Sequence, residues 1–307
     1  MNTKAEIPSN LTSKYTRACI PLLALIVMVM QGCASYTKWR VDAMEPSQKG
    51  IAVESVSIQP FTGEGREHGT TFARLLAGQL TQQGFVKLKQ KGAQGHIVGS
   101  LDGTRTKYET WREKYKRKGK TRYRYHAKVR KSLTASYTLS ANGQTWSESY
   151  TEEYSDEESS RDSYSAAKAE LKSEARIQRQ LMTTLAMKIS QDITPYRVRK
   201  TYKLKLGDTD HLELGADYAK LGREEQAMSI FRQITERTQN DEDRAAALYN
   251  MGVIYEIRGD FNKAFDAYRN ASQFHLEELM YPKAITRLES VISKRNQVDK
   301  QMKVFEK

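Results

Sequence analysis

The sequence has 307 residues with 50 Lys or Arg against 37 Asp or Glu, which gives a formal net charge of +13 at pH 7. That length is sufficient for two domains with ordinary hydrophobic cores. The basic balance is typical of proteins that bind nucleic acid, but an export signal at the N-terminus argues against that partner. Anionic lipid, lipopolysaccharide, peptidoglycan and an acidic partner protein remain as candidates.

Residues 1–32 are expected to form a signal peptide. The first part is basic, and residues 18–30 then form an uncharged, largely apolar run of 13 residues. This run is too short to cross a bilayer core of about 30 Å as a helix, and it fits the apolar region of a secretion signal. The alternatives to lipid attachment at the end of this segment are ordinary signal cleavage nearby and an uncleaved membrane anchor.

The signal ends in Met30-Gln31-Gly32-Cys33, which resembles a lipobox. The resemblance implies that Cys33 is acylated. Ala34 after it implies sorting to the outer membrane, with the folded part facing the periplasm. The other cysteine, Cys19, lies inside the signal, so no disulfide can form in the globular part. Residues 33–49 are then expected to be a membrane tether.

Residues 50–206 have the pattern of a mixed α/β domain. Apolar residues from Phe72 to Leu80 recur at helical spacing, and Gly84 ends that helix. Asn142-Gly143 is a strong signal for a two-residue hairpin turn, and residues 155–162 are expected to be a polar loop. The other expected elements are strands over 51–58, 85–89, 97–115, 121–139, 144–154 and 196–204, the last closing the sheet, and a helix around 171–189.

From His211 onward the sequence is helical and repeats itself. Residues 214–231 recur 37 residues later as 251–268, with glycine, aromatic and alanine positions in common. These positions resemble the tetratricopeptide repeat, whose period is 34. The resemblance covers about 210–276, and a helix around 282–304 would cap the stack.

The order of elements in residues 50–206 is also similar to the small α/β sandwich of periplasmic lipoproteins such as the curli-secretion lipoprotein and the penicillin-binding-protein activator. The segments that match are Ile51-Ala-Val53, Gly84-Phe85, 95–99 and Tyr137-Thr-Leu139. The long basic hairpin departs from that pattern, so no pore-forming or synthase-activating role is carried over. The expected fold class is α+β: a small α/β sandwich with a long β-hairpin, then an all-α tetratricopeptide-repeat domain over 207–307.

The basic segment 105–131 is the main functional feature, with 13 Lys or Arg against two Glu and aromatic residues interleaved. Alternate residues of a strand face one way, which predicts a cationic face with Arg122, Arg124 and His126 and an aromatic face with Tyr123 and Tyr125. Such a ribbon suits anionic lipid head groups, sugar polymers or an acidic protein groove. The alternative is a solvated hairpin whose charges protect an exposed edge. The residues predicted to bind a polyanion or partner are Arg105, Lys107, Trp111, Arg112, Lys114, Lys116, Arg117, Lys118, Lys120, Arg122 and Arg124.

Two further segments carry predictions. Residues 148–158 hold six carboxylates. A solvated loop is the preferred interpretation, and pairing with the basic hairpin is the alternative.

The tetratricopeptide resemblance implies that Tyr249, Asn250 and Val253 present a peptide-binding groove, with the Asn250 amide holding a peptide backbone. The alternative is that these helices only pack against the α/β domain or a partner subunit.

Signatures of catalysis are not found in the sequence. The five histidines show no metal-ligand spacing, and no nucleophile has a credible base beside it. We therefore expect no enzyme, no cofactor and no metal. The preferred function is an outer-membrane-anchored periplasmic scaffold that binds proteins in a secretion, appendage or conjugation apparatus, with homo-oligomerisation left open. The alternative is a regulator of peptidoglycan synthesis that binds a cell-wall synthase or the wall itself.

Overall fold

The structure is a computed structural model that describes residues 36–63, 66–103, 105–207 and 209–305, so the predicted acylation site Cys33 lies outside the described residues. The chain divides into two compact units. The sheet unit consists of Asp42–Arg199 and Ser290–Lys307. The helical unit consists of Lys200–Glu289 and the segment that ends at Val41.

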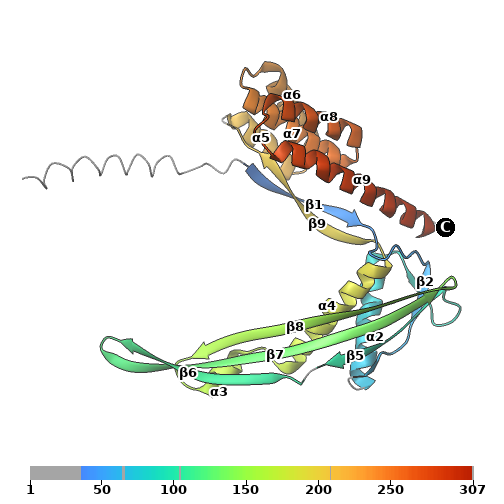
Figure 1. Ribbon diagram of the computed structural model, residues 1–307, viewed down its shortest axis with the longest axis vertical. Coiled ribbons are helices and arrows are strands. Elements are labelled where there is room, and N and C mark those ends of the chain that lie inside the picture. Colours follow the sequence, from blue (N-terminus) through green and yellow to red (C-terminus); the bar gives the residue numbers. More distant parts are fainter. Residues whose placement is uncertain (1–35, 64–65, 104, 208, 306–307) are drawn as a thin grey trace, which may run out of the picture. The chain divides into compact units, whose positions relative to one another are not determined.

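The sheet unit packs helices against one face of a seven-stranded sheet (Figure 1). The strand order is β4-β2-β5-β7-β6, with β3 paired to β5 and β8 paired to β7. Strands β5, β6 and β8 all run antiparallel to β7. The elements are β2 (Ser55–Ile58), β3 (Thr62–Gly63), α2 (Arg66–Gln83), β4 (Lys87–Leu88), β5 (Gly95–Gly103), β6 (Lys107–Arg117), β7 (Lys120–Ala141), β8 (Gln144–Ser160), α3 (Tyr164–Glu170) and α4 (Glu174–Ile193).

Strand β7 organises this sheet because both of its edges are paired. One edge pairs with β6 and then with β5, and the other pairs with β8 from Tyr125 to Ala141. Its odd-numbered residues from Ala127 onward are buried, which is the period of two expected of a strand with one face in the core. On that face they join Leu76 of α2 and Leu185 of α4 in one hydrophobic core.

The opposite face of β7 and β8 carries hydroxyl groups in place of apolar side chains. Thr134 bonds to Thr151 across the two strands at 2.8 Å, and Thr138 bonds to Ser147 at 2.9 Å. This face lines an open groove of about 630 Å³ beside the exposed side chain of Val98. The alternation along β7 therefore separates an apolar core from a polar outer surface.

A buried carboxylate ties helix α4 to both long strands. The hydroxyls of Tyr137 on β7 and Tyr150 on β8 each donate to Oδ2 of Asp192 at 2.7 Å, and Asp192 has no exposed surface. Burial, together with the bond to Asp192, raises the pKa of Tyr137 and of Tyr150 above the ordinary tyrosine value. Both phenols therefore stay protonated as donors at neutral pH.

The helical unit repeats one packing contact. A Cβ built on Gly215 of α5 would lie 2.5 Å from the ring of Phe231 on α6, and a Cβ on Gly252 of α7 would lie 2.5 Å from the ring of Tyr268 on α8. The same glycine-to-ring contact thus recurs after 37 residues, as the sequence does. The helices are α5 (Asp210–Lys220), α6 (Glu224–Arg237), α7 (Asp241–Arg258), α8 (Phe261–Phe274) and the first part of α9 (Met280–Phe305).

Strands β1 (Tyr36–Glu45) and β9 (Tyr196–Lys205) pair with each other in a separate two-stranded sheet. The expectation that the last strand closes the main sheet is therefore wrong. Its partner is a strand formed by residues that sequence analysis assigned to the tether. The Lys203 ammonium lies 4.1 Å from the centre of the Tyr36 ring, so side-chain contacts accompany the backbone pairing.

Other element boundaries also differ from expectation. The predicted strand 97–115 is two strands, because β5 ends at Gly103 and β6 begins at Lys107. The predicted loop 155–162 is mostly strand, because β7 offers β8 a hydrogen-bonding edge as far as Ser160. The helix predicted around 171–189 corresponds to α4, which begins at Glu174, and α3 is a further short helix before it. Within the described ranges, no helix combines the length and apolar character needed to cross a bilayer.

Candidate functional site: a basic hairpin

The hairpin formed by β6 and β7 ends in a tight turn at Lys118 and Gly119. Their φ angles are +50° and +73°, the pair of left-handed conformations that a two-residue hairpin turn requires. Gly119 adopts this conformation freely, whereas a residue with a Cβ does so at a cost of about 1–2 kcal/mol. From residue 114 to 125 the hairpin carries seven Lys or Arg and no Asp or Glu.

The cross-strand register mixes cations and aromatic rings on both faces of the hairpin. Tyr115 lies opposite Arg122, and Arg112 lies opposite Tyr125; residues directly opposite each other share a face. The prediction of one cationic and one aromatic face is therefore wrong. The Arg112 guanidinium also lies 5.1 Å from the centre of the Tyr123 ring, which is within cation–π range.

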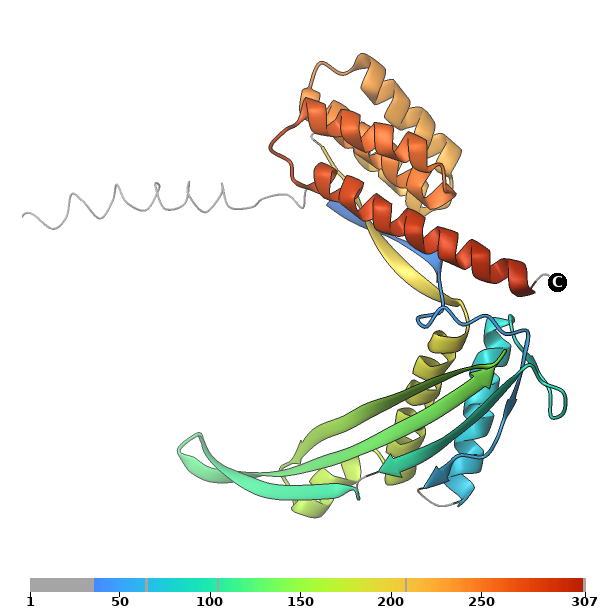
Figure 2. The same ribbon diagram turned by 45° about the vertical axis from the view of Figure 1, so that its right-hand side comes forward.

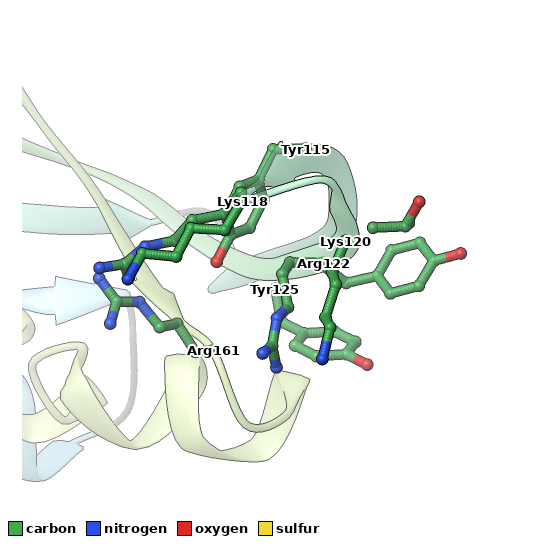
Figure 3. Close-up of a pocket in the computed structure, with 9 residues that line it drawn as sticks. Tyr115, Lys118, Lys120, Arg122, Tyr125 and Arg161 are labelled. Atoms are coloured by element: carbon green, nitrogen blue, oxygen red, sulfur yellow. The ribbon is translucent and has the colours of Figure 1, made fainter.

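An open hollow of about 690 Å³ lies at the tip of this hairpin. Figure 3 shows the ends of Lys118 and Arg161 on one side of it, with Lys120 and Arg122 beside the Tyr125 ring. Its lining contains five cationic side chains, three tyrosines and a threonine, and no lining residue is acidic. The lining residues are Tyr115, Arg117, Lys118, Lys120, Thr121, Arg122, Tyr123, Tyr125 and Arg161.

Carboxylates near the hairpin pair with cations further from its tip. Arg130 contacts Glu109 at 3.6 Å, and Lys128 contacts Glu157 of β8 at 3.8 Å. The acidic run 148–158 therefore lies in a strand beside the basic hairpin, which corrects the preferred interpretation of a solvated loop. These pairs are partly or largely exposed and contribute about 0–1 kcal/mol each, and the cations at the tip keep their positive surplus.

The structure brings together only part of the predicted binding set. Arg117, Lys118, Lys120 and Arg122 line the hollow. Arg161, which follows β8, lines it too. Sequence reasoning missed it because residues 155–162 were predicted to be a loop and not a strand paired with β7. The remaining predicted residues lie elsewhere on or beside the hairpin: Arg105, Lys107, Trp111, Arg112, Lys114, Lys116 and Arg124.

Trp111 has a partner within the hairpin. Its ring stacks on the ring of His126 with the centroids 5.0 Å apart and the planes 7° apart. The two residues lie directly opposite each other on β6 and β7. One ring face of the tryptophan is thus already covered, and Trp111 as a whole is 38% exposed.

The residues predicted to present a peptide-binding groove do not face solvent. Tyr249, Asn250 and Val253 are all at most 1% exposed. Asn250 does hold a peptide backbone, but it is that of Lys205 in the same unit: Oδ1 accepts from the Lys205 N–H at 2.7 Å, and Nδ2 donates to the Lys205 carbonyl at 2.8 Å. The prediction of an open groove at these three residues is therefore corrected, because the chain itself fills the position.

Two family models match this chain, and the gap between their matches contains the boundary between the two units at Arg199 and Lys200. Residues 53–193 match a family model described as lipopolysaccharide-assembly, and residues 213–303 match a domain of unknown function, DUF6340. Neither match spans half of the chain. A search of curated proteins returned no match. The tetratricopeptide repeats and the likeness to the curli-secretion and penicillin-binding-protein-activator lipoproteins stay predictions.

Among solved structures, two PelC dodecamers from Paraburkholderia phytofirmans are similar in part. One of them, a variant with a single leucine-to-methionine substitution, shares 10% identity over 50% of this chain and 98% of its own, with a TM-score of 0.28. The other shares 13% identity over 52% of this chain and 99% of its own, with a TM-score of 0.26. Scores at this level support no conclusion about this chain.

Proposed function

We propose that this chain is an outer-membrane lipoprotein whose hairpin tip binds the phosphorylated head group of lipopolysaccharide within an envelope assembly. The hollow at the tip carries the proposal, because five cations and three tyrosines converge there without a carboxylate. Cations gathered in this way repel one another, and a bound polyanion relieves the repulsion. The match of residues 53–193 to a lipopolysaccharide-assembly family supports this choice of anion.

The chemistry of the lining fits such a ligand. Arginine guanidinium groups bind phosphate oxygens through paired hydrogen bonds, and Arg117, Arg122 and Arg161 are placed to do so. Tyr115 and Tyr125 supply ring faces beside the cations, where a sugar ring or an aliphatic part of the ligand can pack. No proton transfer or bond cleavage is required of these residues.

The test removes three cations from the hollow. Lys118→Asn keeps a residue that tolerates positive φ, and Lys120→Ser with Arg161→Ser completes the variant. The matched control is Lys87→Ser, Lys89→Ser and Lys91→Ser, which removes the same charge from exposed positions. At about 1 kcal/mol for each cation near an anionic surface, the tip variant should bind immobilised lipopolysaccharide on the order of 100-fold more weakly at low salt.

The loss should shrink with rising salt, since the Debye length is about 8 Å near 0.15 M. Dephosphorylated lipopolysaccharide should bind the unaltered protein as weakly as the intact form binds the tip variant. Equal binding by the tip variant and the control would show that the charges are only solvated. Charge-dependent binding to peptidoglycan alone would favour the regulator of wall synthesis.

The anchor and the scaffold role have separate tests. Cys33→Ala should leave the lipid label out and release the protein from the membrane fraction; unchanged labelling and fractionation would contradict acylation. Crosslinking of the full chain in the envelope followed by co-purification should recover a component of a secretion, appendage or conjugation apparatus. Recovery of a wall synthase would instead support the alternative.

A further inference from the structure

The most exposed large apolar side chains are gathered in two loops of the helical unit. Among the described residues, Leu276 is 81% exposed, Leu221 is 71% exposed and Leu279 is 62% exposed. Leu221 follows α5, and the other two lie between α8 and the start of α9. The next most exposed large apolar residue, Leu214 of α5, is 46% exposed, so these three stand apart.

The loop that carries Leu221 lies beside the first residues of β1. Lys220, the residue before Leu221, donates from Nζ to Oγ1 of Thr37 at 3.4 Å. Thr37 is the second residue of β1. A long lysine side chain thus joins this turn to the beginning of the first described strand.

The loop that carries Leu276 and Leu279 reaches the same end of β1. Glu278 lies between the two leucines and pairs with Lys205 at 2.5 Å. Lys205 ends β9, the strand that pairs with β1, and Lys203 two residues earlier contacts Tyr36. Figures 1 and 2 both show the first residues of β1 beside the beginning of α9.

The chain length fixes how far this end can be from a lipid on Cys33. Three peptide units separate Cys33 from Tyr36, and at full extension they span at most about 11 Å. If Cys33 is acylated, as the proposed function requires, Tyr36 therefore lies at the membrane interface. Both leucine loops contact the two strands at this end, one through Thr37 and the other through Lys205.

We infer that the leucines of these two loops form a membrane-docking surface, with a phospholipid bilayer as the partner. Leu221, Leu276 and Leu279 enter the boundary between head groups and acyl chains, where apolar side chains leave water. The exposed cations Lys38 on β1 and Lys203 on β9 lie near the same end and suit anionic head groups. The helical unit would thus be held against the bilayer by its own side chains as well as by the lipid.

The test uses the acylated full chain after signal removal, in which the lipid blocks Cys33. An introduced cysteine is then the sole free thiol, because Cys19 is lost with the signal. Leu276→Cys and, separately, Leu221→Cys are labelled with a polarity-sensitive fluorophore in vesicles of phosphatidylethanolamine and phosphatidylglycerol. Leu88→Cys in the sheet unit, at a leucine that is 44% exposed, is the matched control.

Both probes on the docking surface should shift to shorter emission wavelengths. Spin-labelled phospholipid should quench them several-fold more strongly than the Leu88 probe. Emission and quenching equal to those of the Leu88 probe, with Cys33 shown by mass spectrometry to carry its lipid, would overturn the docking surface and leave the anchor intact. If mass spectrometry shows that Cys33 carries no lipid, the anchor is refuted, and the same probes are read in a Cys33→Ala chain. Quenching there would support the docking surface, and its absence would overturn it.

Discussion

The side-chain amide of Asn250 bonds to both backbone groups of Lys205, at 2.7 Å through Oδ1 and at 2.8 Å through Nδ2. It thereby joins the end of β9 to the middle of α7. The carbonyl and the N–H of Lys205, the last residue of β9, thus both have a side-chain partner in α7. We regard this pair as the contact that fixes how the chain enters the helical unit.

Asn250→Ala should lower the free energy of unfolding by about 1–3 kcal/mol, because it leaves two backbone groups of Lys205 without partners. Denaturant unfolding followed by circular dichroism measures this loss. Asn262→Ala, at an exposed position of α8, is the control and should change the free energy by less than about 0.5 kcal/mol. Equal effects of the two substitutions would contradict the role assigned to Asn250.

Gly252→Ala should destabilise the helical unit, although alanine is the better helix former. The new methyl group would lie 2.5 Å from the Tyr268 ring, and overpacking of this kind costs about 1–3 kcal/mol. Gly78→Ala in α2 is the matched control, because nothing lies within 4 Å of its Cβ position. That control should gain up to about 1 kcal/mol from helix propensity. A gain in both variants would refute the close contact.

Alkaline pH should destabilise the protein through Tyr137. Its pKa is raised by burial and by the bond to Asp192, so the folded chain keeps a proton that the unfolded chain releases above about pH 10. The unfolded state then binds fewer protons, and the free energy of unfolding falls as the pH rises beyond that point.

Tyr137→Phe should flatten this alkaline decline. It should also cost about 1.5–3 kcal/mol at neutral pH, because a hydrogen bond to a buried carboxylate is lost. Unfolding curves between pH 7 and pH 11 give both quantities. Tyr108→Phe, at a 39% exposed side chain of β6, is the control; an identical pH profile for the two variants would contradict the assignment.

Trp111→Ala should act on stability more than on binding. Its ring stacks on His126 at 5.0 Å, and aromatic pairs contribute about 0.5–1.5 kcal/mol beyond the area they bury. We expect a lower melting temperature with unchanged affinity for lipopolysaccharide per folded molecule. Weaker binding at every salt concentration, with the melting temperature unchanged, would instead place the ligand against this ring.

The sequence predicted the parts of the fold that depend on local pattern. The strand expected over 121–139 corresponds to β7 (Lys120–Ala141). Asn142-Gly143 marked a turn that the structure confirms with two positive φ angles. The boundaries that failed depend on partners far away in the chain. Polar residues after Tyr154 indicate a loop, yet they form strand because β7 lies beside them.

The same limit applies to the site. Counting charge located the basic hairpin, but a single strand's alternation could not show that Tyr115 faces Arg122. Arg161 lies 39 residues from Arg122 in the sequence, and only the turn after β8 brings it to the hollow. Asn250 was predicted to hold the backbone of a bound peptide, whereas it holds the backbone of Lys205 at the end of β9.

The recurrence of the Gly215–Phe231 contact as Gly252–Tyr268 makes the helical unit modular. Each helix pair presents the same small residue to the same kind of ring, and the next pair begins 37 residues later. A duplicated segment of that length would carry its own copy of the joint and bury it against its neighbour. The number of helix pairs is therefore a quantity that insertion or deletion of whole segments can change in evolution or in design, while the geometry of each joint is kept.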